Sequence, residues 1–414
     1  MAEPIQSKRA RKRQHEENLI RLEERKAKYG IDPPLSLLNE IDHEEECIAT
    51  LDQEIREDLR RLSPLPPQRY GRFIGRKDSL YKVFAALEDP EAHWIIAIDG
   101  IGGVGKTALA REVVNRSLEA GDFYAVVWES AKPEEFTGGG TQEQFTADID
   151  FDNLLDLIGR KLGYFEVASK RTIEEKRKLV RHILSNERYL VVVDNLETLG
   201  GYRDLVNNLG GMFTRSKAIL TTRKKVAEFR HIYSVSLGGM ERDESIEFIR
   251  SVAGERGEAG DVIRLADEAT LERIHAATGG LPLAMELVVG QATRSSLETV
   301  LERLQTVNFQ AIERPDSAED VYNQFFKFIY WDAWKQLSDE TKTLLIGLGT
   351  FDLAEGADEE ELAIVSGLGG TILGDVAGEL IGHSLIHRSI RDGQPIFFLH
   401  PLTHRFVQSD LVRA

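Results

Sequence analysis

The stretch DGIGGVGKTALAREVV, residues 99–114, gathers four glycines, a lysine and a threonine into the eight residues from Gly100 to Thr107. It follows the apolar run WIIAI, residues 94–98, and leads into a segment of helical character. The eight residues fit the pattern G-x-x-x-x-G-K-[ST]. In that pattern the backbone N–H groups of a glycine-rich turn wrap a phosphate, and a helix N-terminus faces the same anion. We therefore predict a phosphate-binding loop between a strand and a helix.

The residue types in this loop have separate expected roles. Glycines allow positive φ angles and keep side chains away from a bound phosphate. Lys106 is expected to reach the β- and γ-phosphates of a nucleotide, and the Thr107 hydroxyl to ligate Mg²⁺. A glycine-rich turn that binds nothing is the alternative, which the strand–loop–helix context disfavours. The remaining predicted loop contacts are Gly100, Gly102, Gly103, Val104, Gly105 and Ala108.

Two further strand ends supply candidates for the same chemistry. A Mg²⁺-nucleotide site needs an acidic residue at the end of a neighbouring strand, and Asp194 follows the buried-type run LVVV. A strand-terminal Asp that only caps a turn is the alternative. Many ATPases carry a second acid directly afterwards, but Asn195 stands there, with Glu197 two residues on, so hydrolysis is expected to be slow. Arg223 of KAILTTR ends another strand and is expected to contact the γ-phosphate.

Bulk composition limits the class of protein. The chain has 414 residues and a formal net charge of −17, which argues against broad binding to nucleic acid or membrane surfaces. The single cysteine, Cys47, excludes an intrachain disulfide and fits a reducing compartment. No apolar run approaches the ~20 residues that span a bilayer, and the N-terminus lacks an apolar signal core. We expect a soluble cytoplasmic protein of two to four domains.

The alternation of strand-like and helical segments predicts an α/β P-loop NTPase domain over residues 69–238. Its apolar runs are continuous, as in parallel strands that are buried on both faces by helices. The polar, glycine-rich residues 131–150 are expected to form a surface loop. The predicted strands are HWIIAID, YAVVWES, RYLVVVD, SKAILTT and IYSVSL.

Helical patterns dominate the rest of the chain. Residues 239–312 are predicted to form a helical domain. Residues 313–414 are predicted to form a winged-helix domain, because helices are followed by a β-hairpin that turns at Asp392 and Gly393.

The first 68 residues contain a basic run, KRARKR, and two helical stretches before the linker SPLPPQ. The basic run, within residues 1–13, is expected to be a solvated, disordered arm, with nucleic-acid contact as the minor alternative. Apolar residues then recur at heptad spacing, which predicts a seam for a helical partner or, equally, a hairpin packed on itself. The seam residues are Ile41, Ile48, Leu51, Ile55 and Leu62.

Three more blocks surround the phosphate-binding loop in order: RFIGRKDSL (72–80), GGLPLAMEL (279–287) and FLHPLTHRF (398–406). With TTR, this set resembles the NB-ARC class of STAND signalling ATPases over about residues 69–410. That class includes the switch modules of plant immune receptors, apoptosome proteins and many bacterial regulators. The resemblance implies ATP or ADP as ligand, with Mg²⁺, and slow ATPase activity.

The resemblance also implies individual site residues. Pro282 would pack against the base, and His400 would touch the β-phosphate of ADP from the last domain. The family often has Asp after that histidine, whereas this sequence has Pro401. The segment expected to hold the adenine and ribose is Phe73, Ile74, Gly75 and Arg76.

The function that the resemblance implies is a switch. ADP would favour a closed form, and ATP an arrangement that assembles with further copies in bacterial defence or cell death. An effector or sensor protein would then bind in trans through residues 1–68. The alternatives are a DNA-bound transcription regulator and a nucleotide-bound scaffold with little turnover. Nucleic acid is disfavoured because the helix expected to enter a groove, 371–384, contains Asp375 and Glu379 but no Lys or Arg.

Overall fold

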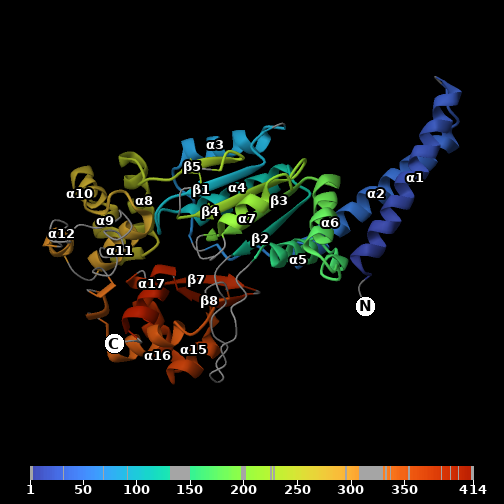
Figure 1. Cartoon of the computed structure of the whole chain (residues 1–414). Coiled ribbons are helices and arrows are strands. Elements are labelled where there is room, and N and C mark those ends of the chain that lie inside the picture. Colours follow the sequence, from blue (N-terminus) through green and yellow to red (C-terminus); the bar gives the residue numbers. More distant parts are fainter. Residues whose placement is uncertain are drawn as a thin grey trace.

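The fold is taken from a computed structural model. It describes residues 3–30, 32–68, 70–90, 92–130, 150–196, 202–223, 226, 229–293, 296–306, 330–331, 333–335, 337–352, 355–383, 385–391, 393–399 and 401–411. A helical hairpin projects from one side of a central sheet, and a helical domain and a C-terminal unit lie on the other side (Figure 1).

The central sheet has five parallel strands in the order β2-β3-β4-β1-β5. The strands are β1 (Ile95–Asp99), β2 (Ala125–Ser130), β3 (Tyr189–Asp194), β4 (Lys217–Thr222) and β5 (Ile232–Ser236). Every residue of β1, β3 and β4 is buried, as continuous apolar runs predict. The predicted parallel sheet with helices on both faces is confirmed.

Alternate residues of each strand enter two different cores. One face packs against α3 (Lys77–Glu88) and α4 (Lys106–Ala120). The opposite face packs against α5 (Phe151–Lys161), α6 (Ile173–Asn186) and α7 (Tyr202–Leu209). A short 3₁₀ helix, Phe165–Val167, follows α5. The carboxyl ends of the strands therefore meet at one edge between two helical layers, where ligands of open α/β sheets bind.

The N-terminal hairpin consists of α1 (Ile5–Tyr29) and α2 (Leu35–Leu62). Its base belongs to the sheet, because Ile5, Ile55 and Leu59 are buried in the same core as α5 and α6. Of the predicted seam, Ile41, Leu51 and Ile55 are buried, whereas Leu62 is 36% exposed. Within the chain α1 packs on α2, which is the hairpin alternative, and a seam for a helical partner stays a prediction.

The expectation of a disordered basic arm is wrong, because the basic run lies inside α1. Lys8 forms ion pairs with Asp58 at 2.7 Å and with Glu54 at 3.3 Å. Lys12 pairs with Asp52. Arg9 donates to the Leu162 carbonyl at 2.7 Å. The positive charges are held by α2 and by the sheet domain, which no local sequence pattern reveals.

The helical domain follows β5. Its helices are α8 (Arg242–Gly254), a 3₁₀ turn (Gly257–Gly260), α9 (Asp261–Arg264), α10 (Glu268–Thr278), α11 (Pro282–Ala292) and α12 (Leu297–Thr306). The C-terminal unit then comprises α14 (Asp339–Leu348), β6 (Ala357–Asp358), α15 (Glu359–Ser366), α16 (Gly370–Gly382), β7 (Ile386–Arg391), β8 (Gln394–Leu399), α17 (Pro401–Phe406) and a π-helical turn (Val407–Leu411).

The hairpin predicted in the C-terminal unit is formed by β7 and β8, which pair antiparallel, with β6 added to β8. Gly393 has a φ of 80° at the turn, whereas Asp392 lies outside the described residues. Among the described residues, α14, α15 and α16 precede the hairpin, in keeping with the order predicted for a winged helix, and that assignment stays a prediction.

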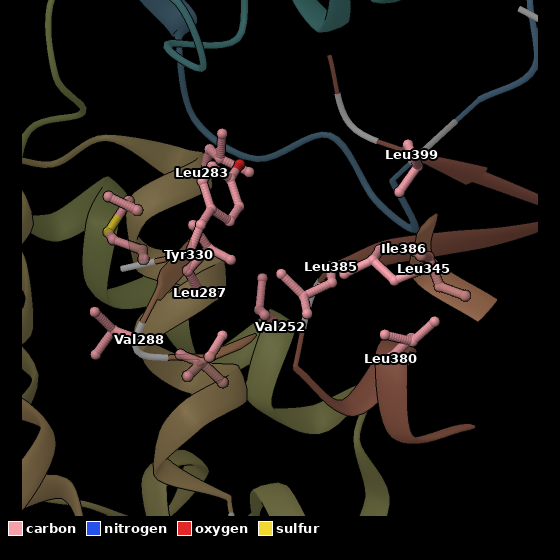
Figure 2. Packing of buried hydrophobic residues seen from close by; sticks show 14 of the residues in the cluster. Val252, Leu283, Leu287, Val288, Tyr330, Leu345, Leu380, Leu385, Ile386 and Leu399 are labelled. Carbon is pink, nitrogen blue, oxygen red and sulfur yellow. The ribbon is translucent and has the colours of Figure 1, made fainter. Parts of the chain in front are cut away.

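One hydrophobic core runs through both the helical domain and the C-terminal unit. Leu283, Leu287 and Val288 of α11 line one side, and Val252 of α8 lies beside Leu385 (Figure 2). Because this core is continuous, the two parts are packed on each other as one body.

Among the described segments, no single helix is long and apolar enough to cross a bilayer. The helices α15 and α16 meet the length and composition of a span only when taken together, and they lie at 96° to each other.

Candidate nucleotide-binding site

The predicted phosphate-binding loop connects β1 to α4 at the carboxyl edge of the sheet. Gly100, Gly103 and Gly105 have φ angles of 151°, 71° and 100°, a region that favours glycine. A Cβ on Gly100 would lie 2.6 Å from the Leu237 carbonyl oxygen, so this position admits no side chain. A Cβ on Gly105 would meet nothing within 4 Å, so the loop leaves space there.

Lys106 and Thr107 begin α4 directly behind this loop. Lys106 is 7% exposed, and its Nζ donates to the carbonyls of Gly100 at 2.8 Å and Ile101 at 2.9 Å. Its charge therefore lies within the loop. Thr107 is exposed and donates through Oγ1 to Oδ1 of Asp194 at 2.8 Å. The two residues predicted to ligate Mg²⁺ are thus in direct contact.

Asp194 at the end of β3 reaches Thr107 at the start of α4, although β3 and β1 are not neighbours. The expectation that the acidic strand lies next to β1 is wrong, because β4 lies between β1 and β3. Thr221 of β4 fills the gap and donates to Asp194 Oδ1 as well. The side chain of Asp194 is 5% exposed, and its other oxygen accepts from Asn195 Nδ2 at 2.8 Å. The hydroxyls of Thr107 and Thr221 thus link Asp194, at the end of β3, to α4 and to β4.

The segment 73–76 joins the sheet domain to the helical domain beside the loop. Phe73 packs on the core of α3 and α4, whereas Ile74 is buried in the core of the helical domain. Gly75 has a φ of 69°, and a Cβ there would lie 2.7 Å from Glu244 Cδ. Arg76 donates to the Val104 carbonyl at 2.8 Å and to the Gly239 carbonyl at 3.4 Å. The segment therefore touches the loop through Arg76.

The block GLPL also touches the loop. Pro282 is the first residue of α11, where its missing N–H costs nothing. The next residue, Leu283, donates its N–H to the Gly103 carbonyl at 3.4 Å. A Cβ on Gly239 would lie 2.0 Å from the Gly279 carbonyl, so the connection from β5 passes close to this block. The loop is thus bonded to both sequence-distant blocks.

Three predicted residues are less completely placed. Arg223 directly follows β4, half-buried, at the strand end that pairs with the end of β1. Glu197 and His400 lie outside the described residues, so their predicted roles stay predictions.

Residues 76–258 match the NB-ARC domain family. These residues are an NB-ARC domain. The match begins at Arg76, includes the loop and both Mg²⁺-ligand candidates, and ends just beyond α8.

Similar proteins are regulators and plant disease resistance proteins. The regulatory protein AfsR of Streptomyces coelicolor is 27% identical over 50% of this chain and 19% of its own length. The disease resistance protein RPP13 of Arabidopsis thaliana is 26% identical over 73% of this chain and 34% of its own length. The chain thus spans about a fifth to a third of these relatives. These likenesses agree with the match of residues 76–258 to the NB-ARC family.

A solved structure has the same fold. The STAND protein with a tetratricopeptide repeat sensor from Pyrococcus horikoshii matches 84% of this chain and 44% of its own chain. Its TM-score is 0.52 at 18% sequence identity, which supports the fold alone.

The residues of the NB-ARC domain fit a nucleotide with Mg²⁺. The loop backbone, which has positive φ angles at its glycines, leaves space for a phosphate beside Gly105. Lys106 supplies a cation inside the loop. Thr107 and Asp194 offer two oxygen ligands. Mg²⁺ bound to nucleotides commonly takes one or two protein ligands and completes its shell with phosphates and water. The described residues contain no group of three or more His, Cys, Asp or Glu that could hold a metal by itself.

Sequence reasoning missed two participants. The hydroxyl of Thr221 and the amide of Asn195 hold Asp194, although TTR had suggested only the following arginine. The guanidinium of Arg76 donates to the carbonyls of Val104 and Gly239, and its expected contact with adenine and ribose stays a prediction. Burial lowers the pKa of Arg76, with Glu244 and Glu241 opposing that shift. Only the order of the strands could have pointed to Thr221.

Proposed function

We propose that this NB-ARC domain binds ATP and ADP with Mg²⁺ and works as a slow ATPase switch. The observation that supports this most is the double attachment of the phosphate-binding loop. Its carbonyls accept from Arg76, at the entry to α3, and from the backbone of Leu283, at the start of α11. A ligand that changes the loop therefore acts on the contact between the sheet domain and the rest of the chain.

The energy that such a switch needs is within reach of phosphate contacts. Moving a two-state equilibrium from 1:99 to 99:1 requires a differential affinity of about 5.5 kcal/mol. Charge-assisted hydrogen bonds are about twice as strong as neutral ones. In the proposal Lys106 and Arg223 bind the γ-phosphate of ATP, and His400 touches the β-phosphate of ADP. Glu197 is the proposed residue for orienting the attacking water.

The finer parts of the proposal concern assembly and location. We propose that the ATP-bound chain associates with further copies, that the protein is cytoplasmic, and that it acts in bacterial defence or cell-death signalling. The likeness to a plant disease resistance protein supports the proposed role in defence. The projecting hairpin α1–α2 is the proposed docking element for an effector or sensor protein.

The DNA-bound regulator is the second candidate, because the regulatory protein AfsR is similar over half of the chain. The surface chemistry supports it less. Asp375 is exposed on α16, which has no Lys or Arg. In α1, Lys8 and Lys12 are already paired with carboxylates. Tight, salt-sensitive binding to random duplex in a gel-shift titration would reverse this ranking.

Nucleotide binding and turnover test the proposal directly. The protein should co-purify with ADP or ATP and bind a fluorescent ADP analogue. Lys106→Ala should lose binding at least tenfold, whereas Lys170→Ala, which changes an exposed lysine of the same domain, should not. Hydrolysis should be slow and should disappear in Asp194→Ala. Equal, negligible rates in all variants would favour the scaffold with little turnover, and absence of nucleotide binding would reject both.

Assembly is tested best with a shortened hairpin. Deletion of all 68 residues would remove Ile55 and Leu59 from the core of the sheet. Replacing residues 17–47 by a short glycine-rich turn keeps that base and removes the tip. The particle mass with ATP, measured by light scattering, should then fall if the tip mediates assembly, and an unchanged mass would reject that role.

A further inference from the structure

Asn195 occupies an unusual position at the end of β3. Its φ of 62° is one of three positive values among the described non-glycine residues. Asn tolerates this left-handed conformation better than most residues do. Its backbone N–H donates to Thr221 Oγ1 at 2.9 Å, so the turn is fixed to β4. The side chain is thereby turned back toward the strand that it follows.

The side-chain amide of Asn195 joins two strand ends. Its Nδ2 donates to Asp194 Oδ2 at 2.8 Å and to Ser130 Oγ, the last residue of β2, at 3.4 Å. The other carboxylate oxygen, Oδ1, accepts from Thr107 and Thr221. Both oxygens of Asp194 are therefore held, one by hydroxyls on the side of the phosphate-binding loop and one by the amide.

A carboxylate held on one oxygen only would be free to turn about its terminal torsion, which is broad and two-fold. The NH₂ group of Asn195 removes this freedom, because it donates to Oδ2. Partners that orient a metal ligand typically change metal affinity by about 10–100-fold when they are mutated. Asn195 stands in such a relation to Asp194.

We propose that Asn195 is a positioning residue that fixes the Asp194 carboxylate for Mg²⁺ beside Thr107. This inference rests on the proposed nucleotide binding, because the metal would arrive with the nucleotide. The amide supplies Asp194 Oδ2 with a donor, which the second acid that many ATPases carry at this position does not. An aspartate at this position would put a second acceptor 2.8 Å from Asp194 Oδ2, where two carboxylates repel each other.

The decisive measurement is the affinity for ADP with Mg²⁺ and with EDTA. The wild-type protein should bind ADP more tightly with Mg²⁺. Asn195→Ala should lose about 10–100-fold of this Mg²⁺-dependent gain. Its affinity in EDTA should stay within about twofold. Asn195→Gly keeps the left-handed backbone without strain and should lose as much. If the glycine variant keeps the full Mg²⁺ effect, the backbone rather than the amide is responsible and the proposal is wrong.

A double-mutant cycle tests whether Asn195 acts through Asp194. In an Asp194→Ala background the further change of Asn195→Ala should have no effect on the Mg²⁺ dependence, because coupled residues are not additive. Equal losses in both backgrounds would overturn the proposal. Asn186→Ala, an exposed asparagine at the end of α6, is the matched control and should change nothing.

A readout without nucleotide comes from Asn195→Asp. Its melting temperature in EDTA should fall below that of Asn195→Ala, and Mg²⁺ alone should narrow the difference because the ion screens the paired carboxylates. Equal melting temperatures in EDTA would count against the proposed contact. If the wild-type protein binds no ADP at all, the proposed function fails first. If it binds ADP with a Mg²⁺ effect that Asn195→Ala leaves intact, only this inference fails.

Discussion

The base of the N-terminal hairpin and the C-terminal unit are attached to their neighbours in the same way, but to different bodies. At the base, Ile5, Ile55 and Leu59 enter the core of the parallel sheet. At the other end, Leu380 and Leu385 enter the core of the helical domain. Local sequence suggested four successive parts, whereas the apolar cores group them into two bodies.

The comparison locates the surface on which a nucleotide would act. The chain passes from the first body to the second between Leu237 and Met240, which belong to different cores. Gly239 lies between them and accepts from Arg76. Ile101 and Leu281 are half-buried against both cores. The boundary therefore runs along the phosphate-binding loop, which is where a switch needs it.

The largest expected effect tests the base of the hairpin. Ile55 is fully buried in the sheet core, so Ile55→Ala should lower the free energy of unfolding of the sheet domain by about 2–5 kcal/mol. Leu35→Ala, at a position 73% exposed near the hairpin tip, should change it by less than about 0.5 kcal/mol. Urea denaturation followed by tryptophan fluorescence measures both. Similar small losses would mean that the hairpin is a separate unit.

The contact between α11 and α16 tests the second body. A Cβ on Gly290 would lie 2.8 Å from the Gly382 carbonyl oxygen and 2.9 Å from the carbonyl carbon of His383. Gly290→Ala should therefore cost about 1–3 kcal/mol by overpacking. Gly374→Ala on α16, where a Cβ meets nothing within 4 Å, should instead stabilise the helix by up to about 1 kcal/mol.

The measurement that distinguishes one body from two is hydrogen exchange. In Gly290→Ala, amides of α11 and α16 should lose protection together, because both flank the altered contact. Loss of protection in α11 alone would show that the helical domain and the C-terminal unit open separately, and would contradict their assignment to one body.

A half-buried glutamate within the second body predicts a pH dependence. Burial raises the pKa of Glu286 on α11 to about 7, with Glu255 adding to the shift and Arg256 opposing it. The folded protein thus binds this proton more tightly than the unfolded chain does. The contribution of Glu286 to stability is complete below the ordinary pKa of Glu, about 4.3, and is lost as pH rises through 7.

Glu286→Gln should remove this dependence. The difference in melting temperature between the variant and the wild type should change between pH 5 and pH 8, with the variant relatively more stable at pH 8. A difference that stays constant over this range would show that Glu286 titrates as an exposed carboxyl.

Local sequence predicted the elements of the fold better than their grouping. The apolar runs of β1, β3 and β4 and the phosphate-binding loop follow from patterns shorter than twenty residues. The ordered basic run of α1 does not, because Lys8 finds its partners at Glu54 and Asp58. Contacts across fifty residues depend on the fold, which periodicity does not encode.

The candidate site likewise contains residues that local sequence predicts and one that it does not. Lys106, Thr107 and Asp194 were predictable because each residue type follows from the chemistry of phosphate and Mg²⁺. The bridging hydroxyl of Thr221 was not, because it requires β4 to lie between β1 and β3. Strand order is set by crossover connections, and similar apolar strands give no local signal of their neighbours.

The smallest expected effect concerns Arg9, at the junction between the hairpin and the sheet domain. The Arg9 guanidinium lies 3.9 Å from the centre of the Tyr164 ring and donates to the Leu162 carbonyl. Arg9→Met keeps an apolar stem but loses the cation–π contact and the hydrogen bond, each of about 1 kcal/mol. Arg21→Met, exposed farther along α1, is the control.

Because Gly163 also packs against Ile5, loss of Arg9 should loosen the hairpin without unfolding the sheet. Protease cleavage near the hairpin base should therefore accelerate in Arg9→Met while the melting temperature falls only slightly. Unchanged cleavage would assign the junction to the apolar contacts of Ile55 and Leu59 alone.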